Sequence, residues 1–210
     1  MKILFFGDSI TDMGRDRNAV TRSAFAYGEG YVFLASADLL AKYPNRFEVV
    51  NRGIGGDRIV DLYGRVKRDV WNENPDVLSI LIGVNDVWHE IINHNGVELD
   101  RFEKVYRMLI EDTKKVLPNV KIMLMEPYVL KGTATKEHIE HFKEVYKYAE
   151  VVKKLAREYG CTFVPLQQTL TALAEKNGVS CYMDDGVHPD APGAKVIADE
   201  WLKAFYKNIL

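Results

Sequence analysis

Short and almost uninterrupted apolar runs alternate with longer amphipathic segments along this chain of 210 residues. The five runs are Lys2–Phe6, Phe47–Asn51, Val77–Ile82, Lys121–Met125 and Thr162–Pro165. Strands that are covered by helices on both faces have continuous apolar runs, and parallel strands need long crossover connections between them. The alternation therefore predicts an α/β fold built on a parallel sheet.

The amphipathic segments between the runs are expected to be helices at about 30–42, 58–71, 99–116, 136–159 and 192–207. Gly160 follows the fourth of them as a helix-ending glycine, and Pro192 falls in the first turn of the fifth, where proline is tolerated. No linker, repeat or low-complexity tract interrupts the sequence. Residues 1–210 are therefore expected to form a single domain with its own core.

Composition excludes several classes of protein. The chain has 28 basic and 30 acidic residues, and this balance argues against a nucleic-acid binder, which would carry a basic surface. No stretch approaches the roughly 20 apolar residues of a membrane span, and the first apolar run is too short for a signal peptide. Cys161 and Cys181 form no C-x-x-C pair, so a reducing compartment is the simpler interpretation, with one disulfide as the alternative. We expect a cytoplasmic protein without a membrane partner.

Polar or glycine-rich clusters follow four of the expected strands. They are Gly7-Asp8-Ser9, Asn51–Asp57, Gly83–Asp86 and Glu126-Pro127-Tyr128, and a fifth cluster, Asp184–Pro189, precedes the last expected helix. In open parallel sheets the ligand binds outside the carboxyl ends of the strands. Because these clusters should converge on that edge, the sequence predicts an active site there.

Ser9 is the candidate nucleophile of this site. A serine hydroxyl reacts only when a neighbouring base takes its proton and a third group orients that base. Directly after a buried strand, Ser9 would present its hydroxyl at the edge of the sheet. Taken alone, however, Ser9 is better explained as the cap of the following helix.

The base should be one of five histidines, and His188 is the best placed. His188 lies in a short constrained loop with Asp185 three residues before it. The Asp185 carboxylate can accept from one ring nitrogen there, while the other nitrogen faces Ser9. An exposed loop histidine is the alternative.

The remaining histidines have weaker cases. His138 and His141 are expected on one face of the long helix at 136–159, and this pair lacks a third metal ligand, which favours a solvated face. His89 and His94 are expected in a polar loop after the third strand, either lining the pocket or exposed.

Donors for a negatively charged reaction intermediate are also present. The backbone N–H groups of Ser9 and of the Gly55-Gly56 turn and the side-chain amide of Asn85 are candidates, although Asn85 is also a common turn residue at a strand end. The same glycines invite a dinucleotide-binding interpretation, but Arg58 stands where the last glycine should be, and no P-loop lysine pattern occurs. The alternatives would require several unrelated coincidences at one edge, so we prefer the catalytic interpretation.

Four blocks of this sequence resemble those of the SGNH, or GDSL, hydrolase family, in the same order and over practically the whole chain. They are Gly7-Asp8-Ser9-Ile10, with Ile in place of the Leu of the family's name, the glycine turn before Asp57, Gly83-Val84-Asn85-Asp86, and Asp185-Gly186-Val187-His188-Pro189. The resemblance implies a three-layer α/β/α flavodoxin-like fold with a five-stranded parallel sheet. It also implies a Ser9–His188–Asp185 triad, an oxyanion hole of Ser9, Gly56 and Asn85, and neither a metal nor an organic cofactor.

Within this family, the segments Phe6–Arg15, Gly83–Trp88 and Glu126–Tyr128 look like those of intracellular bacterial acetyl xylan esterases. That resemblance implies removal of acetyl groups from xylo-oligosaccharides by a homo-oligomer. Trp88 would then stack on a sugar ring, with core packing as the alternative. The polar side chains expected to contact the substrate are those of Asp8, Asp12, Arg15 and Glu29.

We therefore expect a serine esterase that acts on a small ester, with acetylated carbohydrates as the preferred substrate. A lysophospholipase or thioesterase for longer acyl chains is the alternative, but the segment Asp12–Arg22 is polar where such an enzyme needs an apolar channel. A carbohydrate-binding module or an FMN binder on the same fold would have no use for a triad.

Overall fold

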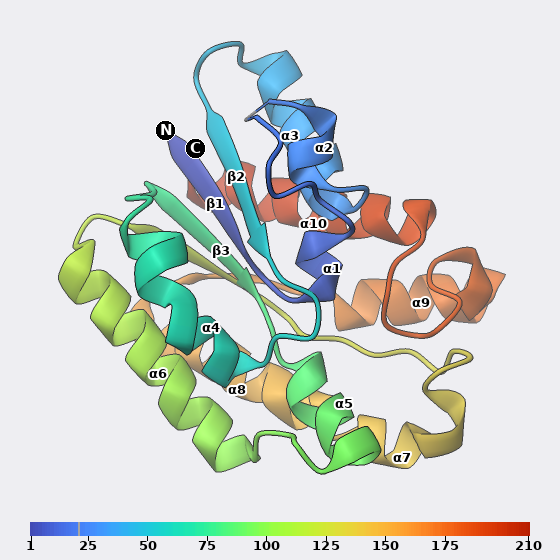
Figure 1. Ribbon diagram of the computed structural model, residues 1–210. Helices are drawn as coiled ribbons and strands as arrows, with labels where there is room; N and C mark the ends of the chain where they lie inside the picture. The colour runs from blue at the N-terminus through green and yellow to red at the C-terminus, as the bar shows by residue number, and fades with distance from the viewer. Residues whose placement is uncertain (21) are drawn as a thin grey trace.

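The computed structural model describes residues 1–20 and 22–210 (Figure 1). Its five parallel strands form one sheet in the order β2-β1-β3-β4-β5. The strands are β1 (Lys2–Gly7), β2 (Glu48–Gly53), β3 (Val77–Leu81), β4 (Lys121–Met125) and β5 (Thr162–Val164). This order is the flavodoxin-like one, so the predicted fold class is confirmed.

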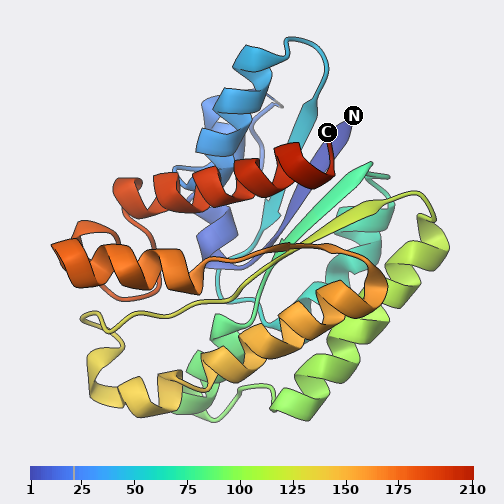
Figure 2. The same ribbon diagram turned by 180° about the vertical axis from the view of Figure 1, so that it is seen from behind.

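Helices cover both faces of the sheet (Figure 1). On one face α3 (Tyr31–Lys42) packs against α10 (Ala191–Asn208), and on the other lie α4 (Ile59–Val66), α6 (Leu99–Val116) and α8 (Val145–Tyr159). The view from behind shows α10 crossing in front of the strands (Figure 2). The three layers follow from the sequence because each helix has an apolar face that it can bury only against the sheet.

Two expected helices are interrupted. The segment expected as a helix at 58–71 is α helical only to Val66 and continues as a π-helical turn, η1 (Lys67–Trp71). The segment expected as one helix at 136–159 is divided into a 3₁₀ turn, η2 (Lys136–His138), α7 (Ile139–Phe142) and α8. This break lets Phe142 pack edge-on against Trp88, with the ring centroids 5.5 Å apart.

Shorter elements complete the chain. They are α1 (Ser9–Asp12), α2 (Ala24–Tyr27), α5 (Val84–Asn93), α9 (Gln167–Asn177) and a 3₁₀ turn, η3 (Val179–Cys181). The prediction of a loop around His89 is therefore wrong, because this residue lies in α5. Val84 and Val87 are buried at the spacing of one helical turn, and this anchors α5 to the core. Gly160 ends α8 in the left-handed conformation that its position predicts.

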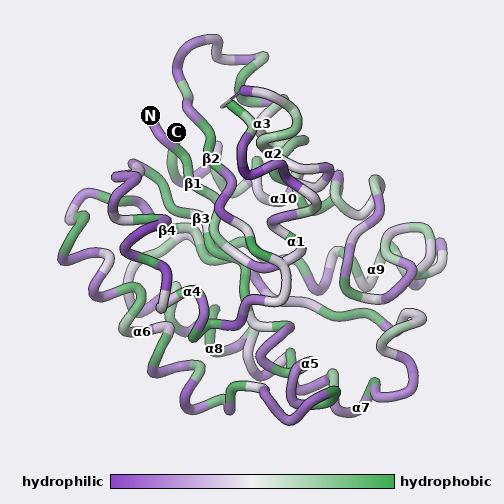
Figure 3. The backbone as a smooth tube through the Cα atoms, in the orientation of Figure 1, coloured by the Kyte–Doolittle hydropathy of each residue, from purple (hydrophilic) through white to green (hydrophobic). Residues whose placement is uncertain are grey.

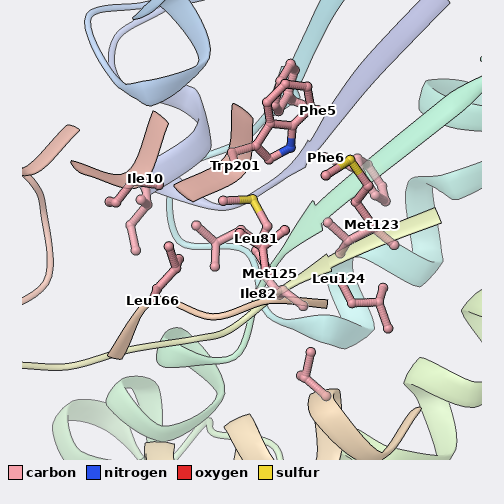
Figure 4. Close-up of a cluster of buried hydrophobic side chains, with 14 of the residues drawn as sticks. Phe5, Phe6, Ile10, Leu81, Ile82, Met123, Leu124, Met125, Leu166 and Trp201 are labelled. Carbon is pink, nitrogen blue, oxygen red and sulfur yellow. The ribbon is translucent and has the colours of Figure 1, made fainter. Parts of the chain in front are cut away.

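The core lies between the sheet and the two helix layers (Figure 4). Successive β1 side chains point to opposite faces: the Phe5 ring contacts Trp201 of α10, and Phe6 lies under Arg65 of α4. The Trp201 indole donates a hydrogen bond of 2.9 Å to the Ser79 hydroxyl, so neither buried polar group is left unpaired. Along the backbone, the central strands are mostly hydrophobic and the outer turns mostly hydrophilic (Figure 3).

The register of the sheet places four loops side by side. Gly7 at the end of β1 pairs with Gly53 of β2 and with Leu81 of β3, and Leu81 pairs with Met125 of β4. The polar clusters that follow these residues therefore start from one edge, as predicted. Within residues 1–20 and 22–210, no helix has the length and apolar character needed to cross a membrane. Cys161 and Cys181 are both free thiols.

Candidate active site

Ser9 is the first residue of α1 and lies directly beyond the end of β1. Its Oγ is 2.7 Å from Nε2 of His188, which is 179 positions away in the sequence. The cap of α1 is not Ser9 but Asp8, whose Oδ1 accepts a hydrogen bond of 3.0 Å from the backbone N–H of Ile10. The Ser9 hydroxyl therefore has no capping role and is left to the histidine.

His188 and Asp185 occupy the loop that leads into α10. Nδ1 of His188 is 2.6 Å from Oδ2 of Asp185, and the other carboxylate oxygen accepts from the backbone N–H groups of Val187 and His188, at 2.8 Å each. The tight loop depends on Gly186, which has a φ of +92° and where a Cβ would lie 2.4 Å from the Leu130 carbonyl oxygen. The structure thus brings together the three predicted triad residues in hydrogen-bonding sequence.

The hydrogen bonds between His188 and Asp185 shift the pKa values of both side chains. The hydrogen bond to Asp185 raises the pKa of His188, and partial burial of the ring opposes it. Burial works against ionisation of Asp185, but the hydrogen bonds from His188 and from the backbone outweigh it and lower the pKa of the carboxyl. Asp185 is therefore an anion at neutral pH, suited to stabilising a protonated imidazole.

The predicted oxyanion donors lie around Ser9. Gly56 has a φ of +84°, which favours glycine, and a Cβ on the preceding Gly55 would lie 3.7 Å from that of Ser9. Asn85, at the start of α5, is 6 % exposed, and its Nδ2 donates a hydrogen bond of 3.1 Å to the Asp57 carbonyl oxygen. That bond uses one of the two amide hydrogens, so the second is available to a substrate.

Asp8 does not face a substrate as the sequence analysis expected. Its side chain is fully buried, with one oxygen capping α1 and the other without a hydrogen-bond partner among the described residues. Burial raises the pKa of Asp8 to about 7. An aspartate next to the nucleophile looks like a loop residue in the sequence, but the cap draws its carboxylate into the protein.

Asp12 and Arg15 brace the glycine turn. Arg15, with 5 % of its side chain exposed, donates hydrogen bonds of 3.1 and 3.0 Å to the Gly53 carbonyl oxygen and forms an ion pair with Asp12. Oδ2 of Asp12 accepts from the Gly55 backbone N–H at 3.4 Å. The Arg15 guanidinium is thus bonded within the protein, contrary to the predicted sugar contact, whereas the Asp12 side chain remains partly exposed.

Trp88 makes the packing contact that was one of its two alternatives, and sugar stacking stays a prediction. It is partly buried in α5, its ring packs on buried Phe142, and its centroid lies 5.9 Å from that of His188. Glu29, in contrast, lines an apolar cavity of about 520 Å³ beside Phe25 and Phe33, and none of the triad residues lines that cavity. The structure thus places Trp88, but not Glu29, beside the triad.

His138 and His141 are both exposed, with their ring centroids 6.3 Å apart. Among residues 1–20 and 22–210, no group of three or more His, Cys, Asp or Glu side chains is arranged to hold a metal ion. His138 and His141 are not part of the hydrogen-bonded chain of Ser9, His188 and Asp185.

Known proteins identify the family of this chain. Residues 5–196 match the model of the GDSL-like Lipase/Acylhydrolase family. The chain belongs to this family. An acetylxylan esterase of Geobacillus stearothermophilus is 35% identical to this GDSL-family chain over 207 residues, which cover 96% of the chain and 92% of the relative. The family and this relative confirm a carboxylic ester hydrolase.

Solved structures give the same assignment. A putative GDSL-like lipase from Parabacteroides merdae superposes with a TM-score of 0.91 at 38% identity, covering 97% of this chain and 94% of that one. Axe2, an acetylxylan esterase from G. stearothermophilus, has a TM-score of 0.86 at 36% identity, with 97% and 93% covered. Two further Axe2 structures are described as catalytic mutants, with alanine in place of a serine or an aspartate.

Two further residues lie near the site of this GDSL enzyme: the sequence left His89 open between a pocket-lining and an exposed position, and it indicated no role for Arg65. His89, one turn beyond Asn85, has its ring beside Gly56, and burial lowers its pKa, with the charge of Arg58 acting in the same direction. Arg65 on α4 binds the carbonyl oxygens of Gly7 and Arg52. The spacing of Asn85 and His89 on one helix face would have indicated the first, had residues 84–93 been recognised as a helix. No local pattern indicates the second.

Proposed function

We propose that this chain is a serine esterase that hydrolyses short-chain esters, acetyl esters above all, on carbohydrates. The observation that carries the proposal is the continuous chain of hydrogen bonds from Ser9 Oγ to His188 Nε2, 2.7 Å, and from His188 Nδ1 to Asp185 Oδ2, 2.6 Å. A hydroxyl, an imidazole and a carboxylate in this sequence can activate a nucleophile and return its proton to a leaving group.

The reaction proceeds in two steps. The Ser9 hydroxyl attacks the ester carbonyl while His188 takes its proton, and the Asp185 carboxylate stabilises the imidazolium that forms. The tetrahedral intermediate then collapses, the alcohol leaves with the proton from His188, and an acyl group remains on Ser9. Water, deprotonated by His188, attacks the acyl-enzyme in the same way and releases the carboxylic acid.

The developing negative charge on the carbonyl oxygen needs fixed donors. The backbone N–H groups of Ser9 and Gly56 and the free amide hydrogen of Asn85 are the proposed donors. Donors of this kind are effective because the fold aims them before the reaction begins, so no reorganisation is needed at the transition state. The buried position of Asn85 and the positive φ of Gly56 support this assignment.

An acetylated carbohydrate is the proposed substrate for two reasons. The acetylxylan esterases are similar over nearly the whole chain, and Trp88 presents a partly exposed indole beside His188, where a sugar ring can stack. A long acyl chain would need an apolar channel at Ser9. The apolar cavity beside Phe25 and Phe33 has neither Ser9 nor His188 in its lining and offers no such channel.

We further propose that residues 1–210 act as one domain, within a homo-oligomer, in the cytoplasm. The single five-stranded sheet supports one domain, and the two unpaired thiols support a reducing compartment. The homo-oligomer is the expectation that follows from the resemblance to acetyl xylan esterases in the sequence. Light scattering of the purified protein gives the mass of the assembly, and a monomer at micromolar concentration would contradict the oligomer.

The test of the nucleophile is Ser9→Ala, with p-nitrophenyl acetate as substrate. We expect kcat to fall by at least about ten-thousandfold while the circular dichroism spectrum is unchanged, because the hydroxyl forms a bond with substrate but packs in no core. Ser180→Ala, at an exposed serine in η3, is the control and should match the wild type. Undiminished turnover in Ser9→Ala would refute the mechanism.

The acyl preference is tested separately, with a series of esters from acetyl to decanoyl and with acetylated xylo-oligosaccharides. We expect kcat/KM to be highest for acetyl and to fall steadily with chain length, and acetate to be released from the oligosaccharides. An optimum at decanoyl would favour the lysophospholipase or thioesterase alternative instead.

A further inference from the structure

Arg65 joins three segments beneath the proposed oxyanion hole. It lies near the end of α4 with 10 % of its side chain exposed, and its guanidinium lies over the Phe6 ring at 4.3 Å. Nη2 donates to the Gly7 carbonyl oxygen at 3.1 Å and Nη1 to that of Arg52 at 2.8 Å. Nε donates to Oδ2 of Asp57 at 2.6 Å. One side chain thus holds the ends of β1 and β2 and the glycine loop.

Each proposed oxyanion donor is close in the chain, or hydrogen bonded, to a group that Arg65 holds. The Ser9 N–H is two residues beyond the Gly7 carbonyl, and the Gly56 N–H belongs to the residue before Asp57. The Asn85 amide donates to the backbone carbonyl of Asp57 itself. A shift of the Arg65 guanidinium would therefore displace all three donors relative to one another.

We infer that Arg65 is a positioning residue for the oxyanion hole, acting through Gly7 and Asp57 and not by contact with substrate. The inference rests on the proposed function, since it concerns the donors that the mechanism needs. Displacing a catalytic group by about 1 Å can cost about a hundredfold in rate, so a residue that fixes three donors has a large effect on kcat from a distance.

The chemistry of the side chain explains why an arginine stands here. Its planar group presents donors in several fixed directions, and four acceptors, including Oδ2 of Asp69 at 2.9 Å, surround it. A lysine at this position keeps the charge, but its single nitrogen cannot reach carbonyl oxygens on two strands and the loop together. The Arg65→Lys substitution therefore separates the geometry of the fork from its charge.

The experiment is a double-mutant cycle of Arg65→Lys and Asn85→Ala, measured as kcat and KM for p-nitrophenyl acetate. We expect Arg65→Lys to lower kcat by roughly tenfold to a hundredfold and to leave KM within about threefold, because the donors act in the transition state. In the Arg65→Lys background, Asn85→Ala should cost less than it does in the wild type, since its amide is already displaced.

Trp71→Phe is the matched control. It removes the 3.0 Å hydrogen bond from the Trp71 indole to Thr113 Oγ1, just beyond α4, and touches none of the three donors. We expect it to lower the unfolding midpoint but to keep kcat. The inference would be overturned if Arg65→Lys had the same kcat as Trp71→Phe, or if it changed only KM. It would also be overturned if the effects of Arg65→Lys and Asn85→Ala on kcat were strictly multiplicative in the double mutant.

Asp57→Ala covers the case in which Arg65→Lys does not fold. It leaves Arg65 on the Gly7 and Arg52 carbonyls and frees only the glycine loop, so we expect a lower kcat with KM retained. A wild-type kcat in Asp57→Ala would overturn the inference. Failure of the proposed function has a different signature, because the wild-type protein itself would then hydrolyse no ester or would prefer decanoyl esters, whatever the Arg65 variants do.

Discussion

Two polar networks meet at the carboxyl edge of the sheet, and they differ in solvent exposure and in the groups that they join. The Ser9–His188–Asp185 chain is partly open to solvent, with 38 % of the His188 side chain exposed, and each of its links joins one side chain to another. The Arg65 network is buried, and two of its links end on backbone carbonyls. The first can exchange protons with a substrate, whereas the second contains an arginine that stays charged at every physiological pH.

The difference shows how the site divides its tasks. A proton carrier needs groups whose pKa values lie near the working pH and a path to substrate. A fixed frame needs the opposite, namely a group that does not titrate and that bonds the backbone from several directions. The networks lie together because the turn after β1 carries both Ser9 and, two residues earlier, the Gly7 carbonyl that Arg65 holds.

The carboxylates at this edge of the sheet differ in how burial and hydrogen bonding shift their pKa values. The hydrogen bonds of Asp185 lower its pKa despite partial burial, whereas burial raises the pKa of Asp57 even though Arg65 opposes it. Deeper in the protein, burial raises the pKa of Asp86 to about 8, although its carboxylate accepts from the Ile59 backbone N–H. Asp69, the other carboxylate that Arg65 binds, behaves like Asp185: burial opposes its ionisation, but the hydrogen bonds from Arg68 and Arg65 outweigh burial and lower its pKa.

The largest effect that distinguishes the networks is expected from Asp185→Asn. An amide can donate to the His188 ring where the carboxylate can only accept, and this favours the wrong tautomer of the base. We expect kcat for p-nitrophenyl acetate to fall by about ten-thousandfold. The control is Asp184→Asn, at the exposed neighbour, which should retain activity. Full activity in Asp185→Asn would mean that His188 does not depend on its carboxylate partner.

The pH dependence of kcat/KM sharpens the comparison. His188 must be neutral to accept the Ser9 proton, and its pKa is raised by the hydrogen bond to Asp185. The acid limb should therefore have its midpoint above the ordinary histidine value of about 6.5, and activity should fall about tenfold per pH unit below it.

The same profile separates the two networks in a variant. Arg65→Lys should lower the plateau of the profile but leave its midpoint in place, because Arg65 makes no contact with His188. A wild-type midpoint clearly below 6.5, or a displaced midpoint in Arg65→Lys, would contradict the division between proton transfer and framework.

The same contrast explains what the sequence could reveal. The strands and the Ser9, Asn85 and His188 blocks were predictable, because each is a contiguous pattern and parallel strands bring such patterns to one edge. The order and spacing of the blocks supplied the partners of Ser9. The Trp88 environment stayed open, because its partner Phe142 ends α7 at a break in the expected helix that no glycine or proline marks.

The Arg65 network could not be predicted, because its partners are scattered along the chain at residues 7, 52, 57 and 69. An arginine on an amphipathic helix is read as a solvated residue unless the fold is known. Asp8 shows the opposite case: it lies next to the nucleophile in the sequence, yet its carboxylate is buried as the cap of α1. In both residues the sequence indicates the polarity but not the direction in which the side chain points.

The smallest expected effect is that of Arg68→Gln, and it tests whether geometry or charge matters in the buried network. Arg68 is 71 % exposed and binds Asp69 from the solvent side, at 2.7 and 2.9 Å. Exposed ion pairs contribute little to stability, and Asp69 keeps its hydrogen bond from Arg65, so kcat and the urea midpoint should match the wild type. If Arg68→Gln instead lowered kcat as far as Arg65→Lys, the site would depend on the charge balance around Asp69. The bonds from Arg65 to the Gly7 and Arg52 carbonyls would then no longer explain how the frame is held.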